Sequence, residues 1–220
     1  NFTIIDSDDV LTIIKKILKD LNLSKELYNP REIKNKISSA KNEMMSVDSF
    51  SKVEFDHNII EVYRLYQKKL KSGNSVDFDD LLILPIKLFK NYPSLLDEYQ
   101  ERYKYILIDE YQDTNEAQYT FSKLLSAKYR NIFVVRDNDQ AIYAFRGANY
   151  KNILNFEKDY KDAKTILLEE NYRSTSNILD AANAVIKHNK QRKDKNLWTS
   201  RGIGEKIKYY RAYNEKDEAN

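Results

Sequence analysis

The chain has 220 residues and a net charge of only +3, because 37 basic side chains nearly balance 34 acidic ones. This length allows one large or two small domains, and the charge balance means that any nucleic-acid binding must come from local patches. The absence of cysteine and the two distant histidines, His57 and His188, exclude disulfides and argue against zinc. No run approaches the ~20 apolar residues of a membrane span and the N-terminus resembles no signal peptide, so we expect a cytoplasmic protein without a membrane partner.

The first third of the chain predicts an all-helical subdomain. Apolar side chains recur at helical spacing in three segments, residues 10–21, 33–44 and 59–70. Asn29 and Pro30 are a typical cap and first-turn residue for the second of these helices. Three lysines cluster near the end of the third, Lys68, Lys69 and Lys71. A solvated helix terminus is the simpler interpretation of them, and contact with a phosphate backbone is the alternative.

Two further helices are expected after residues 73–75 (GNS) interrupt the pattern. The acidic segment 77–80 (DFDD) should cap a strongly apolar helix and interact with its dipole. Pro85 lies inside this helix and should kink or interrupt it. A shorter helix from Pro93 to about Tyr103 should pack through its apolar side chains, Leu95, Leu96 and Tyr99.

An apolar run, residues 105–108 (YILI), leads directly into the acidic pair Asp109 and Glu110. A run without alternation is typical of a strand buried on both faces of a parallel sheet. A helical segment and a second apolar run, residues 131–135, follow and predict a β-α-β unit. Because ligands of open α/β sheets bind at the carboxyl ends of the strands, the acidic pair should share one cleft with the polar residues 136–140 (RDNDQ).

The last third predicts a second α/β arrangement. A strand is expected at residues 165–168 (TILL), a helix around residues 178–185, another strand at residues 206–211 and a capped helical turn at residues 214–218. A basic loop surrounds the only tryptophan, Trp198, and contains Lys190, Arg192, Lys193 and Lys195. A solvated linker is our first interpretation of this loop.

Three polar segments occur in one order, residues 109–115 (DEYQDTN), 137–148 (DNDQAIYAFRGA) and 170–175 (ENYRST). Together they closely resemble the UvrD/Rep/PcrA family of superfamily 1 DNA helicases, and the likeness extends over essentially the whole chain. The resemblance implies an α/β fold, a RecA-like parallel sheet with flanking helices of the P-loop NTPase type, plus the helical insertion subdomain. It also implies that hydrolysis of ATP with Mg²⁺ drives 3′-to-5′ movement on single-stranded DNA and unwinding of duplex DNA.

The resemblance further implies roles for five residues at an ATP site. Asp109 would organise Mg²⁺, Glu110 would polarise the attacking water and Gln140 would sense the γ-phosphate. Tyr172 matches the residue that stacks on adenine. Arg173 matches an arginine finger, a task that suits a side chain that stays charged and grips phosphate oxygens in pairs.

A second set of implied roles concerns DNA. Tyr143, Phe145 and Arg146 lie in the segment that, in the family, contacts single-stranded DNA and places aromatic rings between its bases. Stacking on an aromatic face tolerates any base, which suits a translocating motor. Ordinary core packing of the two rings is the alternative.

The sequence departs from the family pattern in ways that predict a fragment. No Gly-x-x-x-x-Gly-Lys-Ser/Thr phosphate loop is present, and the four glycines are Gly73, Gly147, Gly202 and Gly204. We therefore expect an internal piece of a larger helicase, inactive alone, with the remaining helicase domains as partners. Arg136 stands where the family usually has glycine, and a positive φ there would cost about 1–2 kcal/mol. Ala141 replaces the usual serine.

The expected domains are a helical insertion at residues 1–75, the C-terminal part of a first RecA-like motor domain at 76–163, and the start of a second at 164–220. Two other functions stay open. The first is a catalytically dead DNA-binding or assembly module with a helicase-like fold. The second is a metal-dependent nuclease, which would need Asp137 or Asp139 beside Asp109.

Overall fold

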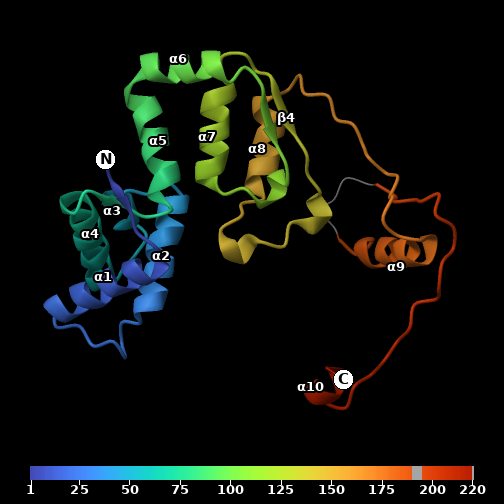
Figure 1. The fold of residues 1–220 in the computed structure, drawn as a ribbon, viewed down its shortest axis with the longest axis horizontal. Helices are drawn as coiled ribbons and strands as arrows, with labels where there is room; N and C mark the ends of the chain where they lie inside the picture. Colours follow the sequence, from blue (N-terminus) through green and yellow to red (C-terminus); the bar gives the residue numbers. More distant parts are fainter. Residues whose placement is uncertain (190–194, 220) are drawn as a thin grey trace. The chain divides into compact units, whose positions relative to one another are not determined.

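The computed structural model describes residues 1–189 and 195–219, and the chain divides into two compact units, Asn1–Asp159 and Tyr160–Asn220 (Figure 1). Lys190, Arg192 and Lys193 of the expected basic loop, together with the side chain of Arg146, lie outside the described part. No helix in the described ranges is both long and apolar enough to span a bilayer.

The first unit begins with the three helices that the 3.6-residue spacing predicts. They are α1 (Ser7–Asp20), α2 (Pro30–Asn42) and α4 (His57–Ser72), with the short α3 (Val47–Phe50) before the last of them. The side chain of Asp6 caps α1 and that of Asn29 caps α2. Ile14, Ile37 and Val62 contribute one buried side chain from each long helix to a common core, so the apolar faces meet as the spacing indicates.

The expectation of an all-helical subdomain is wrong in one respect. The two-residue strands β1 (Thr3–Ile4) and β2 (Ser75–Val76) pair in parallel and join the two ends of the subdomain. Asn74, with a φ of 46°, forms the turn between α4 and β2. Strands of two residues are too short to show a period of two, so the sequence pattern did not reveal them.

A buried cluster of charges connects this subdomain to the helix that follows. Lys41 of α2 is 3% exposed, and its Nζ lies 2.6 Å from Asp77 Oδ2 and 2.8 Å from Asp80 Oδ1. The hydroxyl of Tyr66 in α4 donates to Asp77 Oδ2 at 2.7 Å. Asp77 Oδ1 also accepts the N–H of Asp80, the first residue of the next helix, at 2.9 Å, whereas the N-cap residue Asp79 makes no side-chain capping bond. The sequence predicted a helix start at these acids, and α5 does begin at Asp80, but the buried ion pairs were not predicted.

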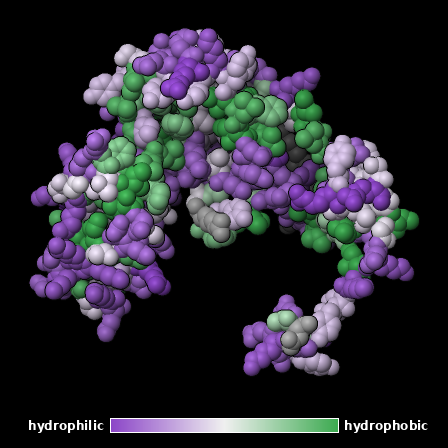
Figure 2. Space-filling model, viewed as in Figure 1, coloured by the Kyte–Doolittle hydropathy of each residue, from purple (hydrophilic) through white to green (hydrophobic). Residues whose placement is uncertain are grey.

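The apolar helix α5 (Asp80–Asn91) runs through Pro85 without a break. It buries Ile83, Ile86 and Phe89, whereas its leucines on the other side are exposed, Leu81, Leu84 and Leu88. Figure 2 shows hydrophobic surface, in green, over this helix. Apolar residues lie on all sides of α5, so the sequence did not indicate which face would be covered.

The helix α6 (Pro93–Arg102) forms where it was expected but buries a different side chain. Leu95 and Leu96 are half-buried and Tyr99 is exposed. The buried residue is Gln100, whose Nε2 donates to the main-chain oxygen of Leu124 at 2.7 Å. This bond joins α6 to α7 (Glu116–Ser126).

The predicted β-α-β unit is confirmed. The strand β3 (Ile106–Ile108) pairs in parallel with β4 (Ile132–Val134), and α7 connects them. The expectation of burial on both faces is wrong, because Leu107 is 73% exposed and its neighbour Phe133 is 59% exposed. An apolar run makes burial of a strand favourable, but other segments must pack on each face of the strand before it is buried. The helix α8 (Lys151–Asp159), which the sequence reading missed, follows β4.

The second unit has less regular structure than the sequence predicts. It contains α9 (Ser176–Ile186) and the short α10 (Glu215–Glu218), which Asn214 caps as expected. The expected strands at residues 165–168 and 206–211 are not formed, and the strand-like pairing described in this unit is one isolated bridge, Glu170 with Trp198. A strand needs a partner for its main-chain groups, and composition alone does not provide one.

Candidate active site

The acidic pair lies where β3 ends, and its backbone is strained. The N–H of Glu110 donates to Asp109 Oδ1 at 2.9 Å, and Glu110 itself is left-handed, with φ 48° and ψ 44°. Such a conformation costs a residue with a Cβ about 1–2 kcal/mol. Strain of this kind persists when the surroundings enforce it and is frequent at functional sites. Both carboxylates are exposed and, with Asp113, line a cavity of about 380 Å³.

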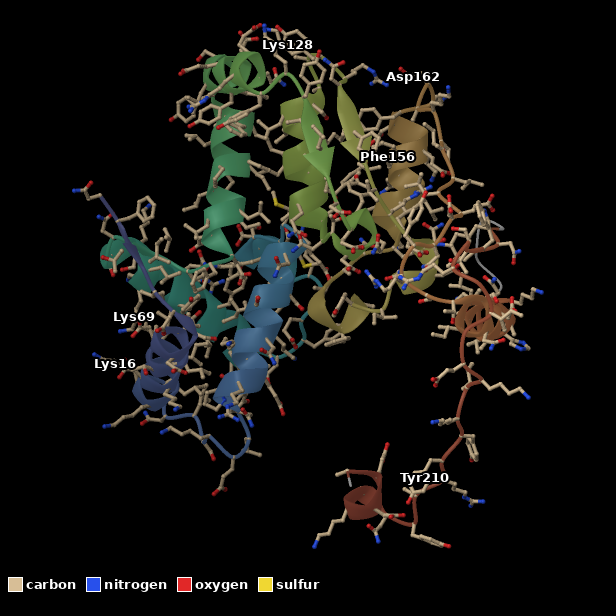
Figure 3. The ribbon with its side chains drawn as sticks, turned by 45° about the vertical axis from the view of Figure 1, so that its right-hand side comes forward. Lys16, Lys69, Lys128, Phe156, Asp162 and Tyr210 are labelled. Carbon is tan, nitrogen blue, oxygen red and sulfur yellow. The ribbon has the colours of Figure 1, made fainter. Side chains whose placement is uncertain are left out.

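A short 3-10 helix, η1 (Tyr111–Asp113), fixes the chain after Glu110. The buried ring of Tyr111 contacts Phe156 edge-on, with the ring centroids 5.5 Å apart. Figure 3 shows Phe156 on α8. The N–H of Tyr111 donates to the main-chain oxygen of Val135 at 2.9 Å. The acidic pair is thereby held against both α8 and the end of β4.

The polar segment after β4 meets the one after β3, as their positions in the sequence predict. Asp137 precedes η2 (Asn138–Gln140), and its N–H donates to Gln112 Oε1 at 3.0 Å. Asp137 Oδ1 accepts the N–H of Asp139 at 3.0 Å, and Oδ2 accepts Nε2 of Gln140 at 2.9 Å. The carboxylate of Asp137 therefore organises its own loop, which does not favour the nuclease alternative.

Arg136 does not carry the backbone strain that a glycine position would impose, because its φ is not positive. Its Nη2 lies 2.6 Å from Glu157 Oε1 of α8, and its Nη1 donates to the main-chain oxygen of Ile153 at 3.4 Å. The guanidinium is thus directed to α8, where Glu157 is its charged partner, and not to the acidic pair Asp109 and Glu110. The strained residue of this region is Glu110.

The two aromatic rings proposed for DNA contact lie next to each other. Tyr143 precedes η3 (Ala144–Arg146), Phe145 lies within it, and the ring centroids are 6.0 Å apart at an interplanar angle of 44°. Phe145 is 78% exposed, which contradicts the core-packing alternative for this ring. Gly147, with a φ of 89°, ends the turn in a conformation that favours glycine.

In the second unit, Tyr172 and Arg173 are exposed on a loop that polar contacts hold. Asn171 Oδ1 accepts the N–H of Arg173 at 3.0 Å, and Arg201 Nη1 donates to the main-chain oxygens of Tyr172 and Arg173 at 3.0 and 3.2 Å. The Tyr172 hydroxyl donates to Glu170 Oε2 at 2.9 Å, and this bond raises the pKa of Tyr172. The sequence reading missed Arg201, which lies far from the loop along the chain.

Comparison with known proteins supports the resemblance seen in the sequence. Residues 1–161 match the family model of the UvrD/REP helicase N-terminal domain, and residues 166–220 match that of the UvrD-like helicase C-terminal domain. The chain belongs to the UvrD/Rep helicase family. It is 53% identical over 223 residues to the ATP-dependent DNA helicase PcrA of Leuconostoc citreum, covering 100% of this chain and 30% of that protein.

Other relatives of this UvrD/Rep family chain show the same coverage. PcrA of Bacillus subtilis (strain 168) is 53% identical over 218 residues, which are 98% of this chain and 30% of that helicase. PcrA of Staphylococcus epidermidis is 50% identical over 222 residues, again 30% of its length. The chain thus spans about 30% of the curated relatives it matches.

Within the first unit of this UvrD/Rep family member, the structure brings together three of the predicted ATP-site residues, Asp109, Glu110 and Gln140. The connection between them is Gln112, which the sequence reading did not single out. The sequence feature that could have pointed to Gln112 is its neutral amide, which stands among acidic and hydroxyl side chains directly after a predicted strand. Tyr172 and Arg173 belong to the second unit and are organised within it.

Proposed function

We propose that the chain is the nucleotide-hydrolysing and DNA-contacting part of a longer ATP-dependent DNA helicase. The whole protein would move 3′ to 5′ on single-stranded DNA in the cytoplasm and unwind duplex DNA. One observation carries the proposal, the strained Glu110 beside Asp109, joined through Gln112 to the loop of Gln140. The PcrA relatives, named as ATP-dependent DNA helicases and half identical over the whole chain, support it.

The chemistry at the end of β3 follows from the donor set. Mg²⁺ takes one or two protein carboxylates together with phosphate oxygens and water, so the exposed carboxylate of Asp109 fits it, and the ion would neutralise charge on the phosphates. Glu110 would orient the attacking water and accept its proton. Gln140, whose amide is held by Asp137, would contact the γ-phosphate.

The remaining helicase parts would be supplied by the longer protein. The proposal assigns residues 1–75 to the helical insertion, 76–163 to the C-terminal part of a RecA-like motor domain and 164–220 to the start of a second. Arg173 would reach the γ-phosphate and Tyr172 would stack on adenine. The phosphate-binding loop, absent from this sequence, would come from another segment.

The deciding experiment is ATP hydrolysis by the full-length protein with and without single-stranded DNA, beside an unwinding assay. We expect DNA to stimulate hydrolysis, and we expect duplexes with a 3′ tail to be opened in preference to those with a 5′ tail. A protein that binds DNA but shows no hydrolysis under either condition would support the alternative, a catalytically dead assembly module. If duplexes with either tail are opened equally well, only the proposed 3′-to-5′ direction of movement is wrong.

The 220-residue chain by itself should bind ATP weakly and leave it intact. Asp109, Glu110 and Gln140 can act only on a triphosphate that is already held in line, and the sequence has no phosphate loop to hold it. The measurement is phosphate release by the purified chain at millimolar ATP. Turnover that disappears in the Glu110→Gln variant would contradict this expectation.

Replacing Tyr143 and Phe145 together by leucine should weaken binding of single-stranded DNA to the full-length protein by about 2–5 kcal/mol. Each stacked ring contributes ~1–3 kcal/mol, and the two are not fully additive. Leucine keeps the apolar bulk but removes the aromatic face. The slope of affinity against salt should barely change, since it reports phosphate contacts.

Binding isotherms at several salt concentrations measure both quantities, and ATPase assays accompany them. Hydrolysis without DNA should stay near normal, whereas its stimulation by DNA should collapse. Replacing Phe55 of the helical subdomain, another exposed ring, by leucine is a suitable control. If the double variant binds single-stranded DNA as tightly as wild type but melts at a much lower temperature, the two rings stabilise the fold and do not contact DNA.

A further inference from the structure

Gln112 is buried between the two loops of the candidate site and uses both ends of its amide. The side chain is 1% exposed. Its Nε2 donates to Glu110 Oε2 at 2.6 Å, and its Oε1 accepts the N–H of Asp137 at 3.0 Å. A carboxylate only accepts and a main-chain N–H only donates, so the orientation of the amide between them is fixed. One neutral side chain therefore bridges the ends of β3 and β4.

Only a side chain with a donor and an acceptor at this reach satisfies both neighbours. Glutamate would keep the acceptor for Asp137 but would place a second carboxylate against Glu110, and like charges at this distance repel. Methionine has a similar length but cannot make either bond. Removing the amide leaves buried polar groups without their partners, which is costly.

The bridge continues to Gln140 through Asp137, which makes one hydrogen bond with its main chain and another with its side chain. The N–H of Asp137 is held by Gln112, and the Oδ2 of Asp137 holds Nε2 of Gln140 at 2.9 Å. Glu110, Gln112, Asp137 and Gln140 thus form one row across the ends of the two strands. The strained backbone of Glu110 persists only where its surroundings hold it, and the bond from Gln112 to the Glu110 carboxylate is one such support.

We propose that Gln112 is a positioning residue that sets the direction of the Glu110 carboxylate and couples it to the loop carrying Gln140. This inference rests on the proposed function, because it assumes that Glu110 handles the attacking water. The same loop leads within a few residues to Tyr143 and Phe145, so a shift of the loop on DNA binding would reach Glu110 through the amide. Gln112 itself need not touch the nucleotide.

The first test replaces Gln112 by methionine in the full-length protein. We expect kcat for DNA-stimulated ATP hydrolysis to fall about 10- to 100-fold, since a misplacement of about 1 Å can cost that much, while KM for ATP stays within about threefold. The matched control is Gln100→Met, which removes another buried glutamine of the same unit with its bond to Leu124. That control should lower the melting temperature with kcat changed by less than about twofold.

A second variant, Gln112→Glu, separates positioning from simple packing. Its remaining acceptor can still hold the N–H of Asp137, so it should disturb the fold less than methionine does. Its kcat should nevertheless fall at least as far as that of Gln112→Met, because the donor to Glu110 is gone. If kcat falls in proportion to the melting temperature in Gln112→Met, Gln112→Glu and Gln100→Met alike, the loss of activity reflects stability alone and Gln112 is not a positioning residue.

Amide hydrogen exchange supplies a readout that does not depend on activity. The peptide containing Asp137 should exchange at least tenfold faster in Gln112→Met but unchanged in Gln100→Met. Unchanged exchange in Gln112→Met would refute the bridge, whatever the kinetics show.

The results also distinguish this inference from the proposed function. A wild-type protein without ATPase activity would refute the proposed function, and the exchange result would still decide whether the bridge exists. Wild-type activity with equal kcat in both methionine variants would refute the inference alone.

Discussion

Replacing Glu110 by glutamine should lower DNA-stimulated ATP hydrolysis by the full-length protein about 10²- to 10⁴-fold, the usual contribution of a general base. The amide has the same shape as the carboxylate but cannot take the proton of the attacking water. Gln112 Nε2, now 2.6 Å from Glu110 Oε2, can donate to an amide oxygen as well, so the local structure should survive. Affinity for ATP should therefore change only a few-fold.

The measurements are steady-state phosphate release and binding of a fluorescent ATP analogue. Glu98→Gln, an exposed acid of α6 away from the site, is the matched control and should behave as wild type. If Glu110→Gln retains more than a tenth of wild-type kcat, Glu110 is not the group that activates water. The strained backbone of residue 110 would then need another explanation.

The largest loss of stability is expected from Lys41→Met. Removing the ammonium leaves two carboxylates, Asp77 and Asp80, buried without a counter-charge, and breaking a buried pair in this way costs about 3–5 kcal/mol. The loss can be measured by urea titration followed by circular dichroism. Arg64→Met is the control, because it breaks the exposed Arg64–Glu61 pair and should cost less than about 1 kcal/mol.

The same variant should reverse the pH dependence contributed by Asp77. Burial raises the pKa of this carboxyl, but the charge of Lys41 and the hydrogen bonds of Lys41 and Tyr66 outweigh burial and hold the pKa below its usual range. A depressed pKa stabilises the fold above the unfolded value, and this contribution is lost only as pH falls through the depressed value. Without Lys41, burial dominates and the pKa of Asp77 should be raised.

Lys41→Met should therefore gain stability, relative to wild type, as the pH falls from 7 toward 4. Asp79 also has a raised pKa, chiefly because of burial, and since the charge of Lys41 lowers it, the substitution should raise the pKa of Asp79 further and act in the same direction. Unfolding free energies at several pH values test this. Parallel curves for the two proteins would show that Lys41 is not the group that holds the pKa of Asp77 down.

Sequence patterns revealed those parts of the fold whose interactions are local. The helices α1, α2 and α4 follow from residues three and four positions apart, and the Asn29 cap acts on the turn directly after it. The parallel pairing of β3 with β4 followed from two apolar runs separated by a helix. The resemblance to a helicase family singled out Asp109, Glu110 and Gln140 because it rested on contiguous segments.

Other features depend on segments that are distant in the chain. Lys41 meets Asp77 and Asp80 only because α2 packs beside the start of α5, so the acids looked like simple caps in the sequence. Gln112 is an uncharged residue that no sequence pattern distinguishes. The proposed role follows from its position between the ends of two paired strands.

The sequence by itself determined the long helices α1, α2 and α4, the apolar runs that form β3 and β4 and the family that the motifs resemble, because each of these is carried by a contiguous segment, but it did not reveal α3 or α8. Only the tertiary structure decided that Leu107 and Phe133 are exposed and that β1 pairs with β2. It also decided that Glu110 is strained and that Gln112 joins Glu110 to Asp137. Burial and the pairing of polar groups depend on which surfaces pack together, and no local pattern encodes that.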